Sequence, residues 1–356
     1  MRSRRGAARP RTAGNTSACR PRCLGRMTLL RIRAAISSVP AILRDSTSSS
    51  TGRRLHLPRR LHHMTTCLKA MKTCHSNMKI GLLAAAAALV FSLSSCAQSS
   101  QSPSPGAWME IPQVPEARAA DVYALSMQVG GKYQRNYTFL WDSSHLTADW
   151  VAYPLCRGNI GEGKRSNAFG LNPFLPESEQ PLLVKGYREG NAGWYSRGHQ
   201  IPSADRLAYT ANVQTFYGTN MTPQDEDLNG GVWGTLENKV RSWAMKCDTL
   251  YVVSGCTYEG YSGDYVKDNS GKKVAVPTGY YKALLTLSNG EYHTCAFRFE
   301  NRPYPDGKYH PDMAESLSSL EQETGITFFP RLKDVVGEAR YRAIKSENPA
   351  QTGLWK

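Results

Sequence analysis

The feature that most constrains the fold is a pair of strand-like runs, residues 280–287 and 292–299, joined through Asn289-Gly290. Asn-Gly is the pair that a two-residue hairpin turn prefers, because both central residues of that turn take positive φ. Two shorter runs of aromatic and β-branched residues, 137–141 and 150–153, flank a polar segment and have the same hairpin pattern. Short connections join antiparallel strands, so the sequence predicts an antiparallel sheet.

Helical patterns accompany these strands. A further buried strand is predicted at 250–254, after a predicted helix at 228–244. Residues 313–323 form a second predicted helix, which ends at Gly325. The expected fold class is therefore α+β, with a central antiparallel sheet flanked by helices.

The positive charge of the chain is concentrated at its start. The net charge is +15 over 356 residues, but residues 1–77 carry 17 Lys and Arg against one acid, Asp45. The remaining residues, 78–356, hold 27 basic and 28 acidic side chains and are nearly neutral. Any phosphate binding must therefore come from a few placed arginines and not from a global field.

An apolar run at 80–93 follows Met78-Lys79 and is too short to span a bilayer. A basic start, an apolar run and small residues after it are typical of a secretory signal. Leu93-Ser94-Ser95-Cys96 resembles a bacterial lipobox. We therefore expect a signal peptide at 78–96 and an extracytoplasmic lipoprotein anchored to a membrane through lipidated Cys96. A buried core helix is the alternative for the apolar run.

The remaining segments follow from this prediction. Residues 1–77 are not expected to be part of the folded mature protein. Either the start codon was assigned too far upstream and translation begins at Met71 or Met78, or the segment is disordered. Their arginine-rich, acid-poor composition would also suit a mitochondrial transit peptide. Residues 97–120 are rich in Ser, Gln and Pro at their start and are predicted to be a flexible tether. The folded domain is expected at 121–335, with a C-terminal tail at 336–356.

Four of the nine cysteines lie beyond Cys96, namely Cys156, Cys247, Cys256 and Cys295. They contain no Cys-x-x-Cys pair, so a structural zinc site is not expected. An oxidising compartment favours one or two disulfides among them, in any of three pairings, with buried free thiols as the alternative.

The segment Arg197-Gly198-His199 carries the first candidate chemistry. In an extended segment, residues two apart point to the same face, so Arg197 and His199 would project together. Gly198 between them would let another group approach the backbone closely. A nearby arginine keeps an imidazole neutral, which is the state that a general base needs. The pair suits phosphate binding and water activation.

The second candidate lies in the predicted helix. Asn229, Trp233, Glu237 and Arg241 recur at four-residue steps and would form one stripe, beside an apolar stripe of Leu228, Val232, Leu236 and Val240. An exposed Glu237–Arg241 ion pair would be the ordinary explanation. That explanation leaves open why Asn229 is followed by two glycines, which permit close approach of a ligand.

These segments resemble a known family. The order Arg-Gly-His-Gln, Thr-Asn-Met-Thr-Pro-Gln and Leu-Asn-Gly-Gly-x-Trp-x-x-Leu-Glu is similar to that of the DNA/RNA non-specific endonucleases of the ββα-metal class, which include mitochondrial endonuclease G. Supporting matches lie at 274–277, 280–282 and 324–330, and the resemblance covers about 130–335.

The resemblance implies an endonuclease that acts on DNA and RNA through phosphate contacts, uses Mg²⁺ or Mn²⁺, and leaves 5′-phosphate and 3′-hydroxyl ends. It implies His199 as the general base, Asn229 as the direct metal ligand and Glu237 as the holder of metal-bound water. Asn220 would support the histidine, and the scissile phosphate would bind to Arg197, Arg241 and Arg165.

One position departs from the family pattern. The family usually has Asp where this chain has Ser196, which leaves open how the Arg-Gly-His segment is braced. The proposed metal site is chemically reasonable, because Mg²⁺ keeps most of its waters and needs few protein oxygens. A catalytically inactive nucleic-acid-binding module on the same scaffold is the alternative function.

Overall fold

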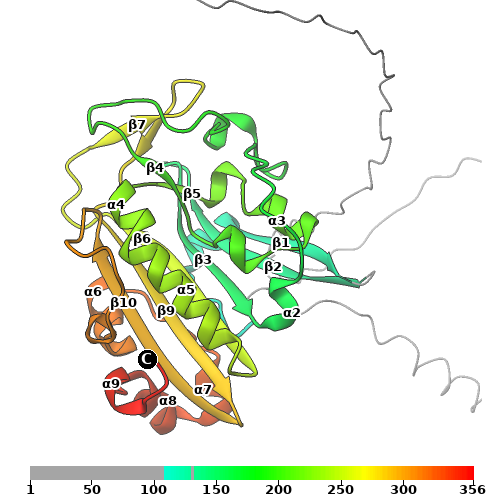
Figure 1. Ribbon diagram of the computed structural model, residues 1–356, viewed down its shortest axis with the longest axis vertical. Helices are drawn as coiled ribbons and strands as arrows, with labels where there is room; N and C mark the ends of the chain where they lie inside the picture. Colours follow the sequence, from blue (N-terminus) through cyan, green and yellow to red (C-terminus); the bar gives the residue numbers. More distant parts are fainter. Residues whose placement is uncertain (1–107, 130–131) are drawn as a thin grey trace, which may run out of the picture.

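The computed structural model describes residues 108–129 and 132–356. Its centre is an antiparallel sheet of six strands in the order β1-β2-β3-β6-β9-β10 (Figure 1). The strands are β1 (Val122–Val129), β2 (Lys132–Asp142), β3 (Thr147–Leu155), β6 (Thr249–Thr257), β9 (Gly279–Ser288) and β10 (Glu291–Glu300). The predicted α+β class with a central antiparallel sheet is confirmed.

The hairpin predicted from Asn289-Gly290 is present. Leu287 pairs with Tyr292 and Ser288 with Glu291. Asn289 and Gly290 have φ of 52° and 82°, the positive values that this tight turn needs. The second predicted hairpin corresponds to the antiparallel pair β2 and β3.

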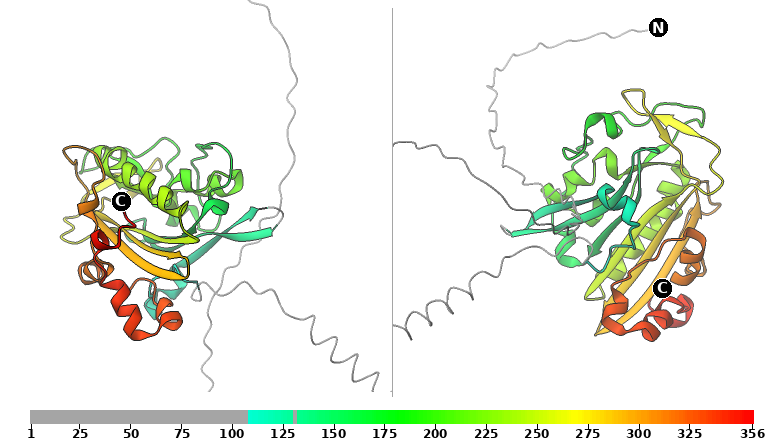
Figure 2. Two further views of the ribbon diagram at one scale, coloured as in Figure 1. Left: turned by 60° about the horizontal axis from the view of Figure 1, so that its bottom comes forward. Right: turned by 180° about the vertical axis from the view of Figure 1, so that it is seen from behind.

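Helices cover both faces of the sheet (Figure 2). On one face, α5 (Val232–Ala244) buries the predicted apolar stripe in the core. Val232 and Leu236 are fully buried there, and burial of such a side chain contributes about 1.5–3 kcal/mol. The other face is covered by α6 (Leu317–Thr324), α7 (Leu332–Val336) and α8 (Glu338–Lys345).

The predicted helix at 228–244 is interrupted. It consists of α4 (Glu226–Gly230) and α5, with Gly231 between them at φ −95° and ψ −115°. A Cβ at Gly231 would lie 2.2 Å from the Asp227 carbonyl oxygen and 3.1 Å from the Cα of Gly307. The glycine therefore permits contact between two backbone segments, and Asn229 does not share a helix with Glu237 as predicted.

Both predicted domain boundaries differ from the structure. Trp108 and Ile111, predicted to lie in the tether, are buried in the core beneath α6 to α8. Trp355, predicted to lie in the tail, is 3% exposed, and α8 buries Tyr341 and Ile344. These segments are mostly polar in composition, so the sequence analysis did not predict that they belong to the folded domain. A few apolar residues within them attach them to the sheet.

The second predicted helix also differs. Residues 313–323 divide into a 3₁₀ turn (Pro311–Met313) and α6, which ends as predicted at Gly325 in a left-handed conformation. The remaining helices of the described residues are α2 (Arg157–Ile160), α3 (Tyr209–Gln214) and α9 (Pro349–Thr352). Further 3₁₀ turns are Glu116–Asp121, Glu177–Glu179, Ser203–Asp205 and Gly218–Asn220. Two small sheets pair β4 (Ser196–His199) with β5 (Met221–Gln224) and β7 (Tyr265–Lys267) with β8 (Lys273–Ala275).

All four cysteines of the domain are free thiols, so the expected disulfides are not formed among them. Cys256 on β6 and Cys295 on β10 are both buried, and β9 lies between their strands. Residues 1–77, the signal peptide and Cys96 lie outside the described residues. Within 108–129 and 132–356, no helix is long and apolar enough to cross a membrane.

Candidate active site

The candidate site is built on β4 and β5, followed directly by α4 and α5. The two strands pair antiparallel, with Arg197 opposite Pro223 and His199 opposite Met221. The chain then forms α4, whose first turn is capped by the Asp225 carboxylate accepting from the Leu228 N–H at 3.0 Å. Since α4 lies against β4, the two motifs singled out in the sequence meet in space.

Gly198 is required by the packing between these strands. A Cβ there would lie 2.4 Å from Oε1 of Gln224 and 2.6 Å from its Cβ, both inside van der Waals contact. The group that approaches the Gly198 backbone is therefore a side chain of the neighbouring strand. Arg197 and His199 lie on the opposite face of β4.

Aromatic rings surround His199. Its imidazole meets Phe216 edge to face, with centroids 5.2 Å apart, and Phe169 at 6.4 Å. The Nε2 atom of His199 is buried and makes no hydrogen bond within the described residues. The ring is therefore desolvated while one of its nitrogens remains uncommitted.

Two arginines lie on the same aromatic rings. The guanidinium carbon of Arg197 is 3.5 Å from the centre of Phe169, and that of Arg165 is 4.8 Å from the centre of Phe216. Burial lowers the pKa of His199 to about 3, and the positive charges of Arg165 and Arg197 contribute to the shift. The imidazole is consequently neutral at physiological pH.

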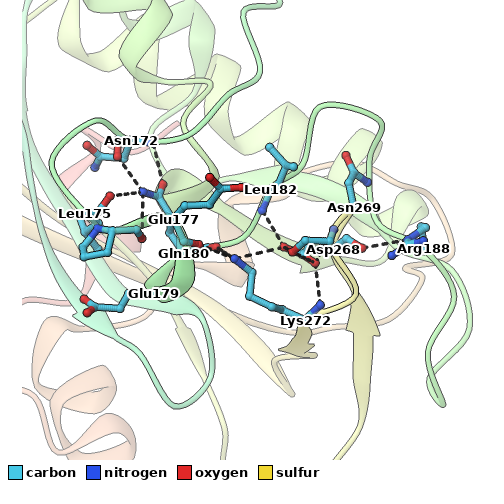
Figure 3. Close-up of polar contacts among 12 residues, drawn as sticks. Asn172, Leu175, Glu177, Glu179, Gln180, Leu182, Arg188, Asp268, Asn269 and Lys272 are labelled. Atoms are coloured by element: carbon cyan, nitrogen blue, oxygen red, sulfur yellow. Dashed lines mark hydrogen bonds and ion pairs between the residues drawn. The ribbon is translucent and has the colours of Figure 1, made fainter.

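Backbone carbonyls hold Arg197 in place, so the absence of a carboxylate at Ser196 does not leave it without support. Its Nη1 donates to the carbonyl oxygens of Leu183 at 2.8 Å and Val184 at 3.1 Å. Figure 3 shows the neighbouring peptide at Leu182 donating to the buried carboxylate of Asp268, at 2.9 Å. A turn after β7 thus fixes the loop whose carbonyls hold Arg197.

Asn220 is fully buried behind the histidine strand. Its Oδ1 accepts from the Ile201 N–H at 3.0 Å, and its Nδ2 donates to the carbonyls of Ile201 at 3.0 Å and Thr215 at 2.8 Å. The backbone N–H of Gln200 also donates to the Asn220 carbonyl, at 3.0 Å. These bonds fix the two residues that follow His199.

Glu237 lies half-buried on α5. Burial raises its pKa to about 7, although the positive charges of Lys282 and Arg241 oppose this rise. The Glu237 charge opposes the lowering of the Arg165 pKa by burial, and the Arg165 charge helps to lower the pKa of His199. Glu237 makes no ion pair with any residue in the described part of the chain.

Arg241 has a different partner from the one expected of a simple helical pair. Its Nη1 donates to the buried carboxylate of Asp205 at 2.8 Å, and its Nη2 donates to Oδ1 of Asn238 at 2.6 Å. The hydroxyl of Tyr153 donates to the same Asp205 carboxylate at 2.9 Å. Arg241 is therefore held by a buried carboxylate, and its partner is not Glu237.

A family model for DNA/RNA non-specific endonucleases matches residues 105–335, more than half of the chain. The chain belongs to this family.

Curated relatives agree with this family assignment. A mitochondrial nuclease EXOG of Danio rerio is 32% identical over 215 residues, which are 57% of this chain and 61% of that protein. A nuclease of Serratia marcescens is 29% identical over 204 residues, 56% of this chain and 75% of that protein. The chain thus spans about three-fifths of the mitochondrial relative. A solved EndoG/EndoGI complex aligns with TM-score 0.43 and 22% identity, over 57% of this chain and 85% of that chain.

The oxygen donors of this family member fit a hydrated divalent cation. The Asn229 side chain, half-buried on α4, makes no hydrogen bond within the described residues, so its carboxamide oxygen is uncommitted. The Glu237 carboxylate likewise has no ion-pair partner there. Carboxamide and carboxylate oxygens are the ligand types that Mg²⁺ prefers.

The sequence analysis did not identify Phe169, Phe216 or Asp205 as site residues. It also did not identify the effect of the Lys282 charge on the pKa of Glu237. Phe216 carries both the His199 ring and the Arg165 guanidinium, but no local spacing links it to either. A lone phenylalanine most often indicates core packing. Only the folded chain brings these rings to the histidine.

Proposed function

We propose that this protein is a divalent-metal-dependent nuclease that hydrolyses phosphodiester bonds of DNA and RNA, with His199 as general base. The observation that carries the proposal is the neutral imidazole of His199, whose Nε2 makes no hydrogen bond within the described residues and which contacts two phenylalanine rings that each carry an arginine. A neutral imidazole with a free nitrogen can take a proton from a water molecule. Adjacent guanidinium groups suit a phosphate substrate.

The proposed roles of the other residues follow from their contacts. Arg165 is exposed and donates its Nε to Oδ1 of Asn167 at 2.8 Å, and its Nη groups would bind the phosphate directly. Arg197 and Arg241 donate from their Nη groups to protein acceptors. Asn229 would hold Mg²⁺ or Mn²⁺ directly and Glu237 through water. When bound, such a cation neutralises charge that develops on the phosphate and on the leaving oxygen.

The substrate range follows from the proposed contacts. Arginines directed at phosphate position a nucleic acid without reading its bases. Cleavage of both DNA and RNA is therefore expected, with 5′-phosphate and 3′-hydroxyl products.

The test is cleavage of plasmid DNA and of RNA by the purified protein with Mg²⁺, with and without a chelator. His199→Ala is expected to lower the rate by about a hundredfold to ten-thousandfold, since that is the usual contribution of a general base. His310→Ala, at an exposed histidine, is the matched control. Unchanged cleavage by His199→Ala would refute the mechanism. Tight nucleic-acid binding by the parent without cleavage would favour the inactive binding module.

We further propose an extracytoplasmic location through a lipidated Cys96. The support is the signal-like sequence at 78–96, which lies outside the described residues. Amino-terminal analysis of the cell-derived protein tests this proposal. A mature chain that begins before Cys96 would exclude the anchor.

A further inference from the structure

Lys282 is an ammonium group enclosed inside the domain. It lies on β9 with 1% of its surface exposed. Its Nζ donates to Oγ of Ser254 at 3.2 Å and lies 4.1 Å from the centre of the Trp233 ring. Burial of an ammonium group is costly unless surrounding groups compensate for its lost hydration.

One side of this lysine leads to the histidine strand. Oγ of Ser254 receives the Lys282 hydrogen bond and donates its own proton to Oε1 of Gln200 at 3.2 Å. Gln200 directly follows His199 and is itself 1% exposed. Lys282 is thus connected to the end of β4 through two hydrogen bonds.

The other side leads to α5. Trp233, over which the ammonium lies, precedes Glu237 by four residues, so the two side chains are neighbours on the helix. Among the positive groups that act on Glu237, Lys282 has the largest effect and Arg241 a smaller one. Arg241 is also committed to Asp205 and Asn238. Lys282 therefore contacts α5 one helical turn before Glu237.

We propose that Lys282 is a positioning residue, whose buried ammonium fixes α5, through the Trp233 ring one turn before Glu237, relative to the β4 segment that carries His199. This inference rests on the proposed function, in which Glu237 holds the water shell of the cation. Lys282 does not touch the substrate. It acts because one ammonium group contacts the Trp233 ring of α5 on one side and, on the other, Ser254, which is hydrogen-bonded to Gln200.

The test uses the full chain and Mn²⁺ as the probe. Lys282→Met keeps the length of the side chain without its charge. It is expected to weaken Mn²⁺ binding, measured by calorimetry on the protein without substrate, by about tenfold to a hundredfold, as for other groups that orient metal-binding residues. The turnover number should fall more than the KM for DNA rises. Lys273→Met removes an exposed cation that lies 4.3 Å from the centre of the Tyr265 ring, and is the matched control.

A double variant separates positioning from simple stabilisation. If Lys282 acts through Glu237, Lys282→Met added to Glu237→Gln should weaken Mn²⁺ binding no further than Glu237→Gln alone. A lysine with only a structural role would lower the melting temperature, leave Mn²⁺ affinity unchanged and give additive effects, which would overturn the proposal. Lys282→Gln, which keeps a donor for Ser254, takes its place if the methionine variant does not fold, with the same expectations.

Failure of the wider proposal gives a different result. If the parent does not bind Mn²⁺, or Asn229→Ala binds it as tightly as the parent, the proposed metal site is wrong. If Asn229→Ala loses Mn²⁺ binding and Lys282→Met does not, only the role of Lys282 is wrong.

Discussion

The imidazole of His199 meets the ring of Phe216 edge to face, with centroids 5.2 Å apart and planes at 89°. The face of the same phenylalanine carries the guanidinium of Arg165. One buried ring therefore excludes water from the histidine and also holds a positive charge near it. Both effects disfavour the imidazolium form, which links the packing of this ring to the chemistry proposed for His199.

The lowered pKa of His199 predicts a stability that depends on pH. The pKa is about 3 in the folded protein, below the ordinary value of about 6.5, so the unfolded chain binds more protons between these limits. The free energy of unfolding should therefore decrease as pH falls from about 6.5 towards 3, with no contribution from His199 to the slope above that range. Thermal unfolding of the parent and of His199→Gln from pH 7 to pH 4 measures this. Equal losses in both proteins would contradict the prediction.

Gly198→Ala should destabilise the protein and lower its activity. The added Cβ would clash with Gln224 at 2.4 Å and 2.6 Å, and such overpacking costs about 1–3 kcal/mol. Gly230→Ala is the matched control, because its Cβ would meet nothing within 4 Å and alanine favours a helix by up to about 1 kcal/mol. Denaturant unfolding gives both values. A Gly198→Ala protein as stable as Gly230→Ala would show that β4 and β5 do not pack as described.

Asp205→Asn should be strongly destabilising. Its carboxylate is 1% exposed and joins Arg241 and Tyr153 at 2.8 Å and 2.9 Å. Removal of one partner from a buried ion pair typically costs about 3–5 kcal/mol. Glu291→Gln, which breaks an exposed pair with Arg340, should cost about 0–1 kcal/mol. Chemical denaturation of the two variants compares these costs. Similar values would show that the Asp205–Arg241 ion pair does not stabilise the protein as a buried pair.

The four thiols of the domain should differ in reactivity. Burial raises the pKa of Cys256 to about 12 and that of Cys295 well above its ordinary range, and the thiolate is the reactive form. Cys156 and Cys247 are only partly buried, so iodoacetamide should modify them in the native protein, and Cys256 and Cys295 only after unfolding. Peptide mass spectrometry with and without prior reduction measures this pattern. A cystine peptide among these four residues would contradict the free-thiol arrangement.

Cleavage should depend weakly on salt. Residues 78–356 hold 27 basic and 28 acidic side chains, so binding neutralises few phosphates at once. Initial rates on DNA between about 50 and 200 mM salt should fall far less than the thousandfold expected of a protein with many phosphate contacts. A steep decline would reveal a basic surface beyond the arginines named above.

Much of the sheet was predictable because its signals are local. Strand alternation and the Asn289-Gly290 turn act over a few residues, and the observed register of β9 and β10 follows from them. The helical period likewise predicted the buried stripe of α5. The break at Gly231 was not predictable, since it depends on contact with Gly307, which is distant in the chain.

The sequence by itself determined which residue types stand at which spacing, and so placed Arg197 and His199 on one face of a strand and identified the family. Only the tertiary structure decided their partners. Arg197 is held by two backbone carbonyls, Arg241 by Asp205, and Lys282 by Ser254 and the ring of Trp233. The physical reason is range: strand and helix periods are set by backbone geometry within a few residues, whereas the meeting of buried charges depends on how distant segments pack.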